Sequence, residues 1–392
     1  VIGLTNNITG SKSTLFVGES NVGKVGDSNI VIGKANDVSG SNMTIVSGYD
    51  NEIVDGSYNI VSGNSHNITK AVESAGFGKN ITISNSSQIL SSGENNTITT
   101  NSIGSFVSGK NNTELTGEYN GILGINNSLI TNKQVLTSGE SNTVTTNVNT
   151  GIIGKSNVVL NSGNTMVQGL SNQINNSNQS TILGWGNNVT NTDYAIIQGK
   201  TNVVTSSSNI AIFGSTNDIN DEERSMTIGN TNDIQFGEDS YHGGKLNDIT
   251  GVKQSIVVGT SNTLQTNTNI ALFGRDHIVS STDESIIAGK NITEQGGKHN
   301  AQFGIGHSAT NAEGIINVGK DNLITGTTKY SAIFGETHNI TSAIKSITSG
   351  HNNTLTSCTS SASFGEELTL KDATNSSLTV GTGNLLSNSS NN

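Results

Sequence analysis

The 392-residue chain contains no proline and a single cysteine. A proline removes one ladder hydrogen bond wherever it falls inside a β-sheet, so its absence suits a chain built from closely stacked strands. Cys358 cannot form an intrachain disulfide, because the chain has no second cysteine. One thiol suits an exported protein that avoids cysteine and suits a cytosolic protein equally, so it does not assign a compartment.

The chain is also poor in aromatic residues (4%) and hydrophobic residues (31%), too poor for a globular core of this length. Its net charge of -11 argues against a nucleic-acid partner, whose phosphates require a basic face. No phosphate-binding loop, nucleophile elbow or metal-ligand spacing occurs. We therefore predict no enzyme activity, no cofactor and no metal site.

Glycine, in contrast, recurs at a nearly fixed interval. There are 26 such anchor glycines; 22 of the 25 intervals between them are fifteen residues long and three are sixteen. A fixed short period is the signature of a solenoid, in which every repeat adds one coil to a stack. Because the register never breaks, we expect one continuous all-β domain over residues 1–392, a solenoid of about 26 coils.

Two further columns follow each anchor glycine. Three residues after it the residue is Asn in 19 of 26 coils and His in four more, and five residues after it stands Ile, Val or Leu in 22 of 26. Asn amides stacked at this spacing can form a hydrogen-bonded ladder, so we assign the four His a scaffold role. Representative structural positions are Gly33, Asn36, Gly154, Asn157, Gly259 and Asn262.

A short apolar run precedes each glycine, such as Ile256-Val257-Val258. We expect two strands per coil, one ending at the glycine and one carrying the Asn and aliphatic columns. Because the run is apolar at successive positions, both of its faces must be covered. One face can line the coil, and the other then needs a partner chain, so we predict an obligate homo-oligomer with cyclic symmetry.

Segments such as Ser28 to Gly40 (SNIVIGKANDVSG) resemble the head repeats of trimeric autotransporter adhesins, the YadA-like parallel β-roll of Gram-negative bacteria. The resemblance covers the whole chain, although these coils are one residue longer than the family's commonest repeat and carry Asn where many members have Ala. It implies a left-handed roll and a homotrimer. Signal peptide, heptad stalk and C-terminal membrane-spanning strands are missing, so we expect an excised head whose native start is not Val1.

The same resemblance implies a function in cell adhesion and virulence. The head would attach a bacterium, through an outer-membrane anchor missing here, to a host cell-surface glycoprotein such as a carcinoembryonic-antigen-related cell adhesion molecule, or to an extracellular-matrix protein. A rigid oligomer that displays repeated sites strengthens weak contacts by multivalency.

The position directly after the anchor glycine is normally Lys or Glu, which makes a charged edge. Leu170 and Trp185 occupy it in consecutive coils, and Tyr49 and Ile125 occupy it elsewhere. Exposed apolar groups on such an edge predict a docking patch, flanked for the first pair by Lys155 and Lys200. The alternative is that these side chains fold over a neighbouring chain of the oligomer.

The coil around Tyr241 and His242 is the most irregular, because its apolar run is lost. It could form a local bulge or a receptor-facing loop, and we include both residues among the candidate receptor contacts. The acidic segment Asp221-Glu222-Glu223-Arg224 connects two coils, and we interpret it as a solvated turn in preference to a cation site.

Two other functions stay open as alternatives. The first is an ice-binding or structural solenoid. Ice binding would need an uninterrupted outward array of Thr-x-Thr, whereas the pattern occurs only at scattered coils, such as Thr97/Thr99 and Thr143/Thr145. A carbohydrate-acting β-helix enzyme would need paired carboxylates in a groove and is the least favoured.

Overall fold

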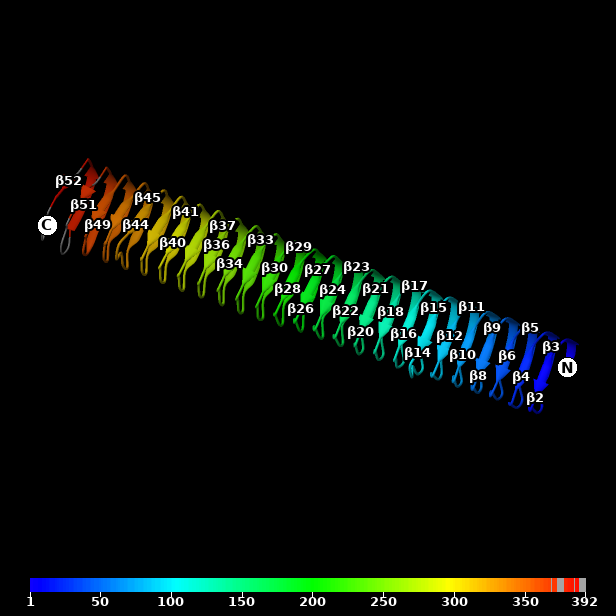
Figure 1. The fold of residues 1–392 in the computed structure, drawn as a ribbon. Coiled ribbons are helices and arrows are strands. Elements are labelled where there is room, and N and C mark those ends of the chain that lie inside the picture. Colours follow the sequence, from blue (N-terminus) through cyan, green and yellow to red (C-terminus); the bar gives the residue numbers. More distant parts are fainter. Residues whose placement is uncertain (368, 372–376, 384, 388–392) are drawn as a thin grey trace. The chain divides into compact units, whose positions relative to one another are not determined.

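The computed structural model describes residues 1–367, 369–371, 377–383 and 385–387, which form strands and turns throughout. The chain divides into two compact units, Val1–Ile197 and Gln198–Asn392. Each unit is a parallel β-solenoid with about fifteen residues per turn, in which every turn contributes one strand to each of two sheets (Figure 1). The parallel, repetitive all-β architecture expected from the sequence is therefore confirmed, while the single continuous domain stays a prediction.

The first sheet, which we call the long-strand sheet, carries the anchor glycines. In the first unit its strands are β1 (Ile2–Leu4), β3 (Leu15–Glu19), β5 (Ile30–Lys34), β7 (Ile45–Tyr49), β9 (Ile60–Asn64), β11 (Ala75–Lys79), β13 (Leu90–Glu94), β15 (Phe106–Lys110), β17 (Gly121–Ile125), β19 (Leu136–Glu140), β21 (Gly151–Lys155), β23 (Met166–Leu170) and β25 (Thr181–Trp185). In the second unit they are β29 (Ala211–Ser215), β31 (Met226–Asn230), β33 (Tyr241–Lys245), β35 (Ile256–Thr260), β37 (Ala271–Arg275), β39 (Ile286–Lys290), β41 (Ala301–Ile305), β43 (Ile316–Lys320), β45 (Ala332–Glu336), β47 (Ile347–His351), β49 (Ser361–Glu366) and β51 (Ser377–Thr382). Strand β27 (Ile196–Lys200) contains the boundary between the units.

The second sheet, the short-strand sheet, carries the aliphatic column. In the first unit its strands are β2 (Asn7–Thr9), β4 (Val22–Lys24), β6 (Asp37–Ser39), β8 (Glu52–Val54), β10 (Asn67–Thr69), β12 (Thr82–Ser84), β14 (Thr97–Thr99), β16 (Thr113–Leu115), β18 (Ser128–Ile130), β20 (Thr143–Thr145), β22 (Val158–Leu160), β24 (Gln173–Asn175) and β26 (Asn188–Thr190). In the second unit they are β28 (Val203–Thr205), β30 (Asp218–Asn220), β32 (Asp233–Gln235), β34 (Asp248–Thr250), β36 (Thr263–Gln265), β38 (Ile278–Ser280), β40 (Thr293–Gln295), β42 (Ser308–Thr310), β44 (Leu323–Thr325), β46 (Asn339–Thr341), β48 (Thr354–Thr356), β50 (Thr369–Leu370) and β52 (Leu385–Leu386).

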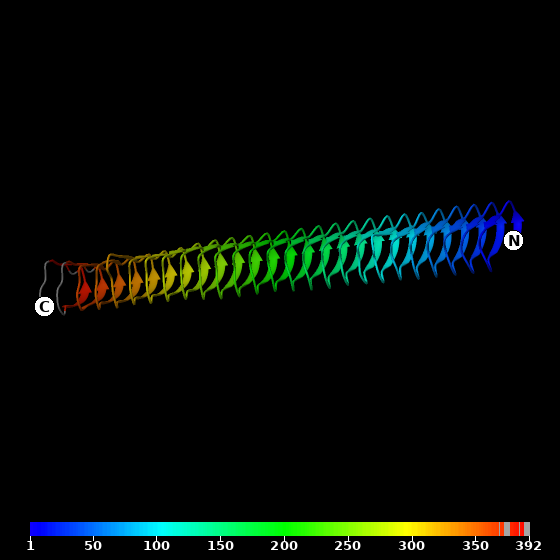
Figure 2. The ribbon, with the colours of Figure 1, turned by 60° about the horizontal axis from the view of Figure 1, so that its bottom comes forward.

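Three corners close each coil, where the sequence had led us to expect two strands only. In the coil that follows Gly139, the corners are Ser141, Thr146 and Asn149, with φ of 58°, 56° and 53°. Between the last two corners, Val148 forms a single parallel bridge to the coils on either side. The predicted two strands are confirmed, and this third edge of isolated bridges was not predicted. Figure 2 shows the strand arrows within each unit lying side by side and pointing the same way.

The anchor glycine is required because successive coils approach closely at this point. Gly154 has a φ of 131°, and a Cβ placed there would lie 1.9 Å from the carbonyl oxygen of Gly169 in the next coil. A side chain would therefore collide with backbone, which cannot move without breaking the ladder that pairs the two glycines.

The predicted Asn ladder is present. The side-chain oxygen of Asn142 accepts hydrogen bonds from the backbone N and from Nδ2 of Asn157, both at 3.0 Å, and Nδ2 of Asn157 also donates to the Gly169 carbonyl at 2.9 Å. Asn157 in turn accepts from Asn172. Each buried amide therefore satisfies two neighbouring coils along the stack.

His66 takes the place of Asn in the ladder and uses its two ring nitrogens separately. Nδ1 of His66 lies 3.1 Å from the backbone N of Ile81 and accepts its hydrogen bond, while Nε2 lies 3.2 Å from the Ser62 carbonyl. This arrangement requires the neutral ring protonated on Nε2. Burial lowers the pKa of His66, which favours that neutral form. The scaffold role assigned to these histidines from the sequence agrees with these contacts.

The interior is lined from both sheets. Relative to the anchor glycine, the residue at -2, such as Ile152, and the aliphatic residue at +5, such as Val159, are fully buried. The residues at -3 and at -1 point out of the coil. Stacked over successive coils they form two rows, which we call the -3 column and the -1 column, and the residues directly after the glycines form the +1 column. None of the described residues forms a helix of the length and hydrophobicity that a membrane crossing requires.

Candidate binding surfaces

The strongest sequence candidate, the pair Leu170 and Trp185, lies in the +1 column of strands β23 and β25. The two residues are direct partners in the parallel ladder, and they are 39% and 46% exposed. Lys155 is the ladder partner of Leu170 on its other side and forms an ion pair with Glu140 at 3.0 Å. The exposed, adjacent placement expected from the sequence is thus observed, and the role in receptor binding stays a prediction. Lys200, the expected flank on the other side, belongs to the second unit.

Tyr49 and Ile125 also occupy the +1 column and are exposed, but each stands alone. Tyr49 pairs in the ladder with Lys34 and Asn64, and Ile125 pairs with charged neighbours on both sides. The coils of Glu140 and Lys155 separate Ile125 from Leu170. Among these candidates, only Leu170 and Trp185 form a contiguous apolar pair.

The coil of Tyr241 and His242 is neither a bulge nor a receptor-facing loop, which corrects the expectation from the sequence. Both residues lie in β33, which pairs regularly with β31 and β35. A strand ladder needs only backbone groups, so losing the apolar run does not break it. His242 takes the inward -2 position and is completely buried. This burial lowers the pKa of His242 to about 4 and excludes direct contact with a receptor. Tyr241 is half-buried in the -3 column.

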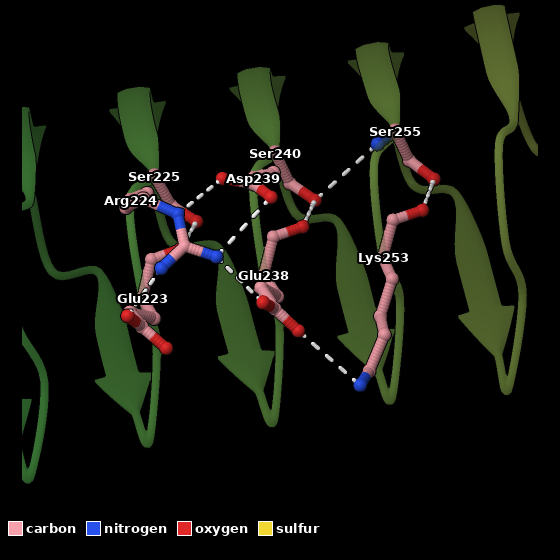
Figure 3. Close-up of polar contacts among 8 residues, drawn as sticks. All are labelled: Glu223, Arg224, Ser225, Glu238, Asp239, Ser240, Lys253 and Ser255. Carbon is pink, nitrogen blue, oxygen red and sulfur yellow. Dashed lines mark hydrogen bonds and ion pairs between the residues drawn. The ribbon is translucent and has the colours of Figure 1, made fainter.

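The acidic segment after Asn220 is an ion-pair network on the surface (Figure 3). The guanidinium of Arg224 contacts Glu223, Glu238 at 2.6 Å and Asp239 at 2.6 Å, and Lys253 contacts Glu238 at 3.2 Å. Each of these three carboxylates therefore contacts a cation. The exposed Glu223 and Arg224 agree with a solvated turn, whereas Glu222 does not. Within the described residues, no three His, Cys, Asp or Glu side chains come together as ligands for a metal ion.

Glu222, in the same segment, is buried, which the sequence analysis missed. It is 2% exposed, and neither of its carboxylate oxygens has a hydrogen-bond partner of normal geometry among the described residues. A Cβ at Gly237, in the next coil, would lie 1.9 Å from Oε1 of Glu222, so only glycine leaves room for the carboxylate. Burial raises the pKa of Glu222 to about 7, an effect that nearby Ser225 and the Gly237 backbone only partly oppose.

Two further carboxylates, Glu114 and Glu294, are buried at +5 in place of an aliphatic residue. Oε1 of Glu114 accepts hydrogen bonds from Ser105 at 2.7 Å and from Asn120 at 2.8 Å. Glu294 repeats this arrangement with a serine and an asparagine, each 180 residues further along the chain, and gains a third bond from Gln302 at 2.7 Å. Burial raises the pKa of both carboxyl groups.

A recurring sequence signal marks these two sites: Glu in the aliphatic column, followed by Gly at three residues and Asn at six. The glycine matters because a Cβ at Gly117 would lie 1.8 Å from Oε1 of Glu114. Neither site opens to solvent, so they act inside the scaffold and do not offer a substrate site.

Within each unit, the outer face of the long-strand sheet is an exposed apolar surface. Its -3 and -1 columns contain no charged residue between Leu15 and Val380. In the first unit the exposed bulky members are Leu15, Ile32, Ile45, Ile60, Phe77, Leu90, Phe106, Leu123, Leu136, Ile153, Met166 and Ile196. In the second unit they are Met226, Ile228, Ile256, Phe273, Ile286, Phe303, Ile316, Phe334, Ile347, Phe364, Leu378 and Val380. The sequence analysis expected one face of the apolar run to be left uncovered by the coil itself, and this is observed.

The outer face of the short-strand sheet is polar by comparison. The first residues of five consecutive short strands form an in-register hydroxyl row: Thr82, Thr97, Thr113, Ser128 and Thr143. The parallel row two residues further on is interrupted by Leu115 and Ile130. A paired Thr-x-Thr array is therefore incomplete here, as the sequence had indicated.

No protein-family model matches the chain, and no curated protein matches it either.

Proposed function

We propose that this chain is the head of a homotrimeric bacterial surface adhesin, a left-handed β-roll that attaches the cell to a host surface protein. The full protein would be anchored in the outer membrane. The resemblance of the coil sequence to YadA-like head repeats suggests this function. The observed solenoid and its uncovered apolar face support it, because a chain of this kind needs partner copies to cover that face.

One observation carries the binding role: Leu170 and Trp185 are exposed and adjacent on an edge that is otherwise mostly polar or charged. Aromatic anchors of this kind contribute most of the energy at many protein interfaces. A trimer would present the pair three times, so weak single contacts would add up. The partner would be a host cell-surface glycoprotein, such as a carcinoembryonic-antigen-related cell adhesion molecule, or an extracellular-matrix protein.

The test is attachment of the purified head, wild type or Trp185→Ala, to immobilised matrix proteins and to host cells. We expect the variant to lose most attachment, on the order of thirtyfold for a lost anchor worth about 2 kcal/mol, with an unchanged melting temperature. Tyr119→Ala is the matched control, because Tyr119 is an exposed aromatic residue of the same unit at a coil corner. Lowered stability with full attachment per folded molecule would assign Trp185 to the scaffold and place the binding site elsewhere.

A second candidate function, binding to ice, is favoured by the hydroxyl row from Thr82 to Thr143, whose members repeat about every 4.8 Å along the stack. The interruption at Leu115 and Ile130 weighs against it. Thermal hysteresis measured on the purified chain separates the two functions: a freezing point held below the melting point would support ice binding, and attachment lost with Trp185 would support adhesion.

A further inference from the structure

Bulky and small side chains alternate along the outer face of the long-strand sheet. From Ala271 to Phe364 the -3 column alternates Ala and Ile from coil to coil without exception. The -1 column alternates in the opposite phase, with Phe wherever the -3 residue is Ala and Ala, Val or Ser wherever it is Ile. The seven pairs are Ala271/Phe273, Ile286/Ala288, Ala301/Phe303, Ile316/Val318, Ala332/Phe334, Ile347/Ser349 and Ala362/Phe364.

Two shallow, open hollows in this face lie over small residues. One hollow of about 330 Å³ lies over Ala271 between Ile256 and Ile286, and polar residues that precede the strands, Glu284 among them, border its outer side. Another of about 340 Å³ lies over Ala362 between Ile347 and Leu378. Each hollow is wide enough to receive an aromatic ring. Phe273, on the same strand as Ala271, is 42% exposed.

The face is also large enough to hold two chains together. Its twelve exposed bulky side chains in the second unit present roughly 70 Å² each, so on the order of 800 Å² of apolar surface. That is about the area one partner contributes to a stable interface and more than the largest patch of an ordinary monomer. The absence of charge from both columns matches the core of an interface, because charged residues are depleted there.

We propose that a second copy of this chain docks on this face, and that the alternation fixes its axial register. This inference rests on the proposed function, because it requires that copies of the chain associate. A rotation axis parallel to the stack keeps every coil at its own height, so the -1 column of one copy meets the -3 column of the next at the same coil. Phe273 of one copy then enters the hollow over Ala271 of the next, and in the following coil Ala288 faces Ile286.

The unshifted arrangement therefore places a bulky side chain against a small one at every coil. A slip of one coil would set Phe273 against Ile286 and Ala288 against Ala301, so that collisions alternate with voids along the stack. Both defects are destabilising in packed interfaces. The alternation accordingly rejects the one-coil slip, the most accessible error for a surface that repeats every fifteen residues.

The test uses the complete chain in three variants: Ala271→Phe, which fills the hollow, Phe273→Ala, which removes the side chain that enters it, and Phe236→Ala. Phe236 is an exposed Phe at a corner outside both columns and is the control for losing an aromatic group. Native mass spectrometry over a concentration series measures association, and circular dichroism confirms that each variant is folded.

We expect Ala271→Phe to raise the concentration for half-dissociation at least about tenfold, Phe273→Ala to raise it less, and Phe236→Ala to leave it unchanged. When Ala271→Phe and Phe273→Ala are mixed, oligomers that contain both variants should outnumber oligomers of either variant alone. In the mixed oligomers the added Phe at position 271 of one copy faces the Ala at position 273 of the other. That rescue between chains separates the effect from packing within one chain.

The outcomes distinguish the register from the assembly. A wild-type chain that is monomeric at micromolar concentration would overturn both this inference and the proposed oligomeric head. A wild-type oligomer that Ala271→Phe leaves intact, or that mixes the variants at random, would overturn the register while leaving the proposed head in place.

Discussion

Replacing Glu222 by Gln should stabilise the protein at pH 8 and have much less effect at pH 5. The folded chain holds this carboxyl group inside the coil without a hydrogen-bond partner of normal geometry, so its charged form is strongly disfavoured. Its pKa rises from 4.5 to about 7. At 1.36 kcal/mol per pKa unit, a shift of this size corresponds to about 3 kcal/mol.

The sign follows from which state loses its proton first. As the pH rises above 4.5, Glu222 ionises in the unfolded chain while it stays protonated in the folded one. The folded state is therefore favoured fully below pH 4.5, and this contribution is lost as the pH rises through about 7. Gln carries no proton to lose, so the advantage of the variant over the wild type should grow by about 3 kcal/mol between pH 4.5 and pH 8.

The assay is urea unfolding of wild type and variant at pH 5 and pH 8, supported by hydrogen exchange in the coils around Glu222. A buried Gln amide imposes its own constant cost, so the informative quantity is the difference between the two pH values. The buried histidines have lowered pKa values and lose stability as the pH falls below 6.5, but their effect is common to both proteins and cancels. Glu223→Gln is the control, because Glu223 is exposed and paired with Arg224. An advantage for Glu222→Gln that is equal at both pH values would refute the reasoning.

Two further predictions concern the repeat itself. Asn157→Leu should lower the free energy of unfolding by on the order of 1 to 3 kcal/mol, because the Gly169 carbonyl and the Asn172 amide lose their hydrogen-bond partner. Asn157→His should lower it less, and equal losses in thermal melts would contradict the ladder. Gly154→Ala should prevent the coil from closing, while Gly151→Ala should fold normally because no atom lies near the position of its Cβ. Circular dichroism and solubility compare the two variants. Normal folding of Gly154→Ala would contradict the close approach of successive coils.

The repeat could be predicted from the sequence because each column has one structural role. The glycine period set the coil length, and the shared column of Asn and His indicated a position where a side-chain acceptor is needed, as the contacts of Asn142 and His66 confirm. Periodicity alone did not show the direction of the side chains in the apolar run. The -2 residue, such as Ile152, points inward and its two neighbours point outward. Only the structure shows that the -3 and -1 positions are the ones available to a partner.

The features that the sequence analysis missed are single substitutions inside a column. Glu114, Glu222 and His242 each look like surface residues by type, yet the fold turns them inward. For the two carboxylates, a second residue several places away compensates the burial: Gly117 makes room beside Glu114 and Asn120 donates to it, and Gly237 makes room beside Glu222. In the sequence such a position is only an irregularity in its column, because the compensating residue lies in another column and meets it only in the folded stack of coils.

The alternation on the outer face is a different kind of signal, because nothing inside the chain requires it. Bulky residues stack directly on one another elsewhere in the same column, as Ile45 does on Ile60 and Leu90 on Phe106, so a single chain tolerates neighbouring bulky groups. The inward -2 column between Leu272 and Ser363 shows no alternation either. A pattern with a thirty-residue period on a fifteen-residue scaffold therefore points to a constraint outside the coil, and the second copy proposed above, held in register, would supply that constraint.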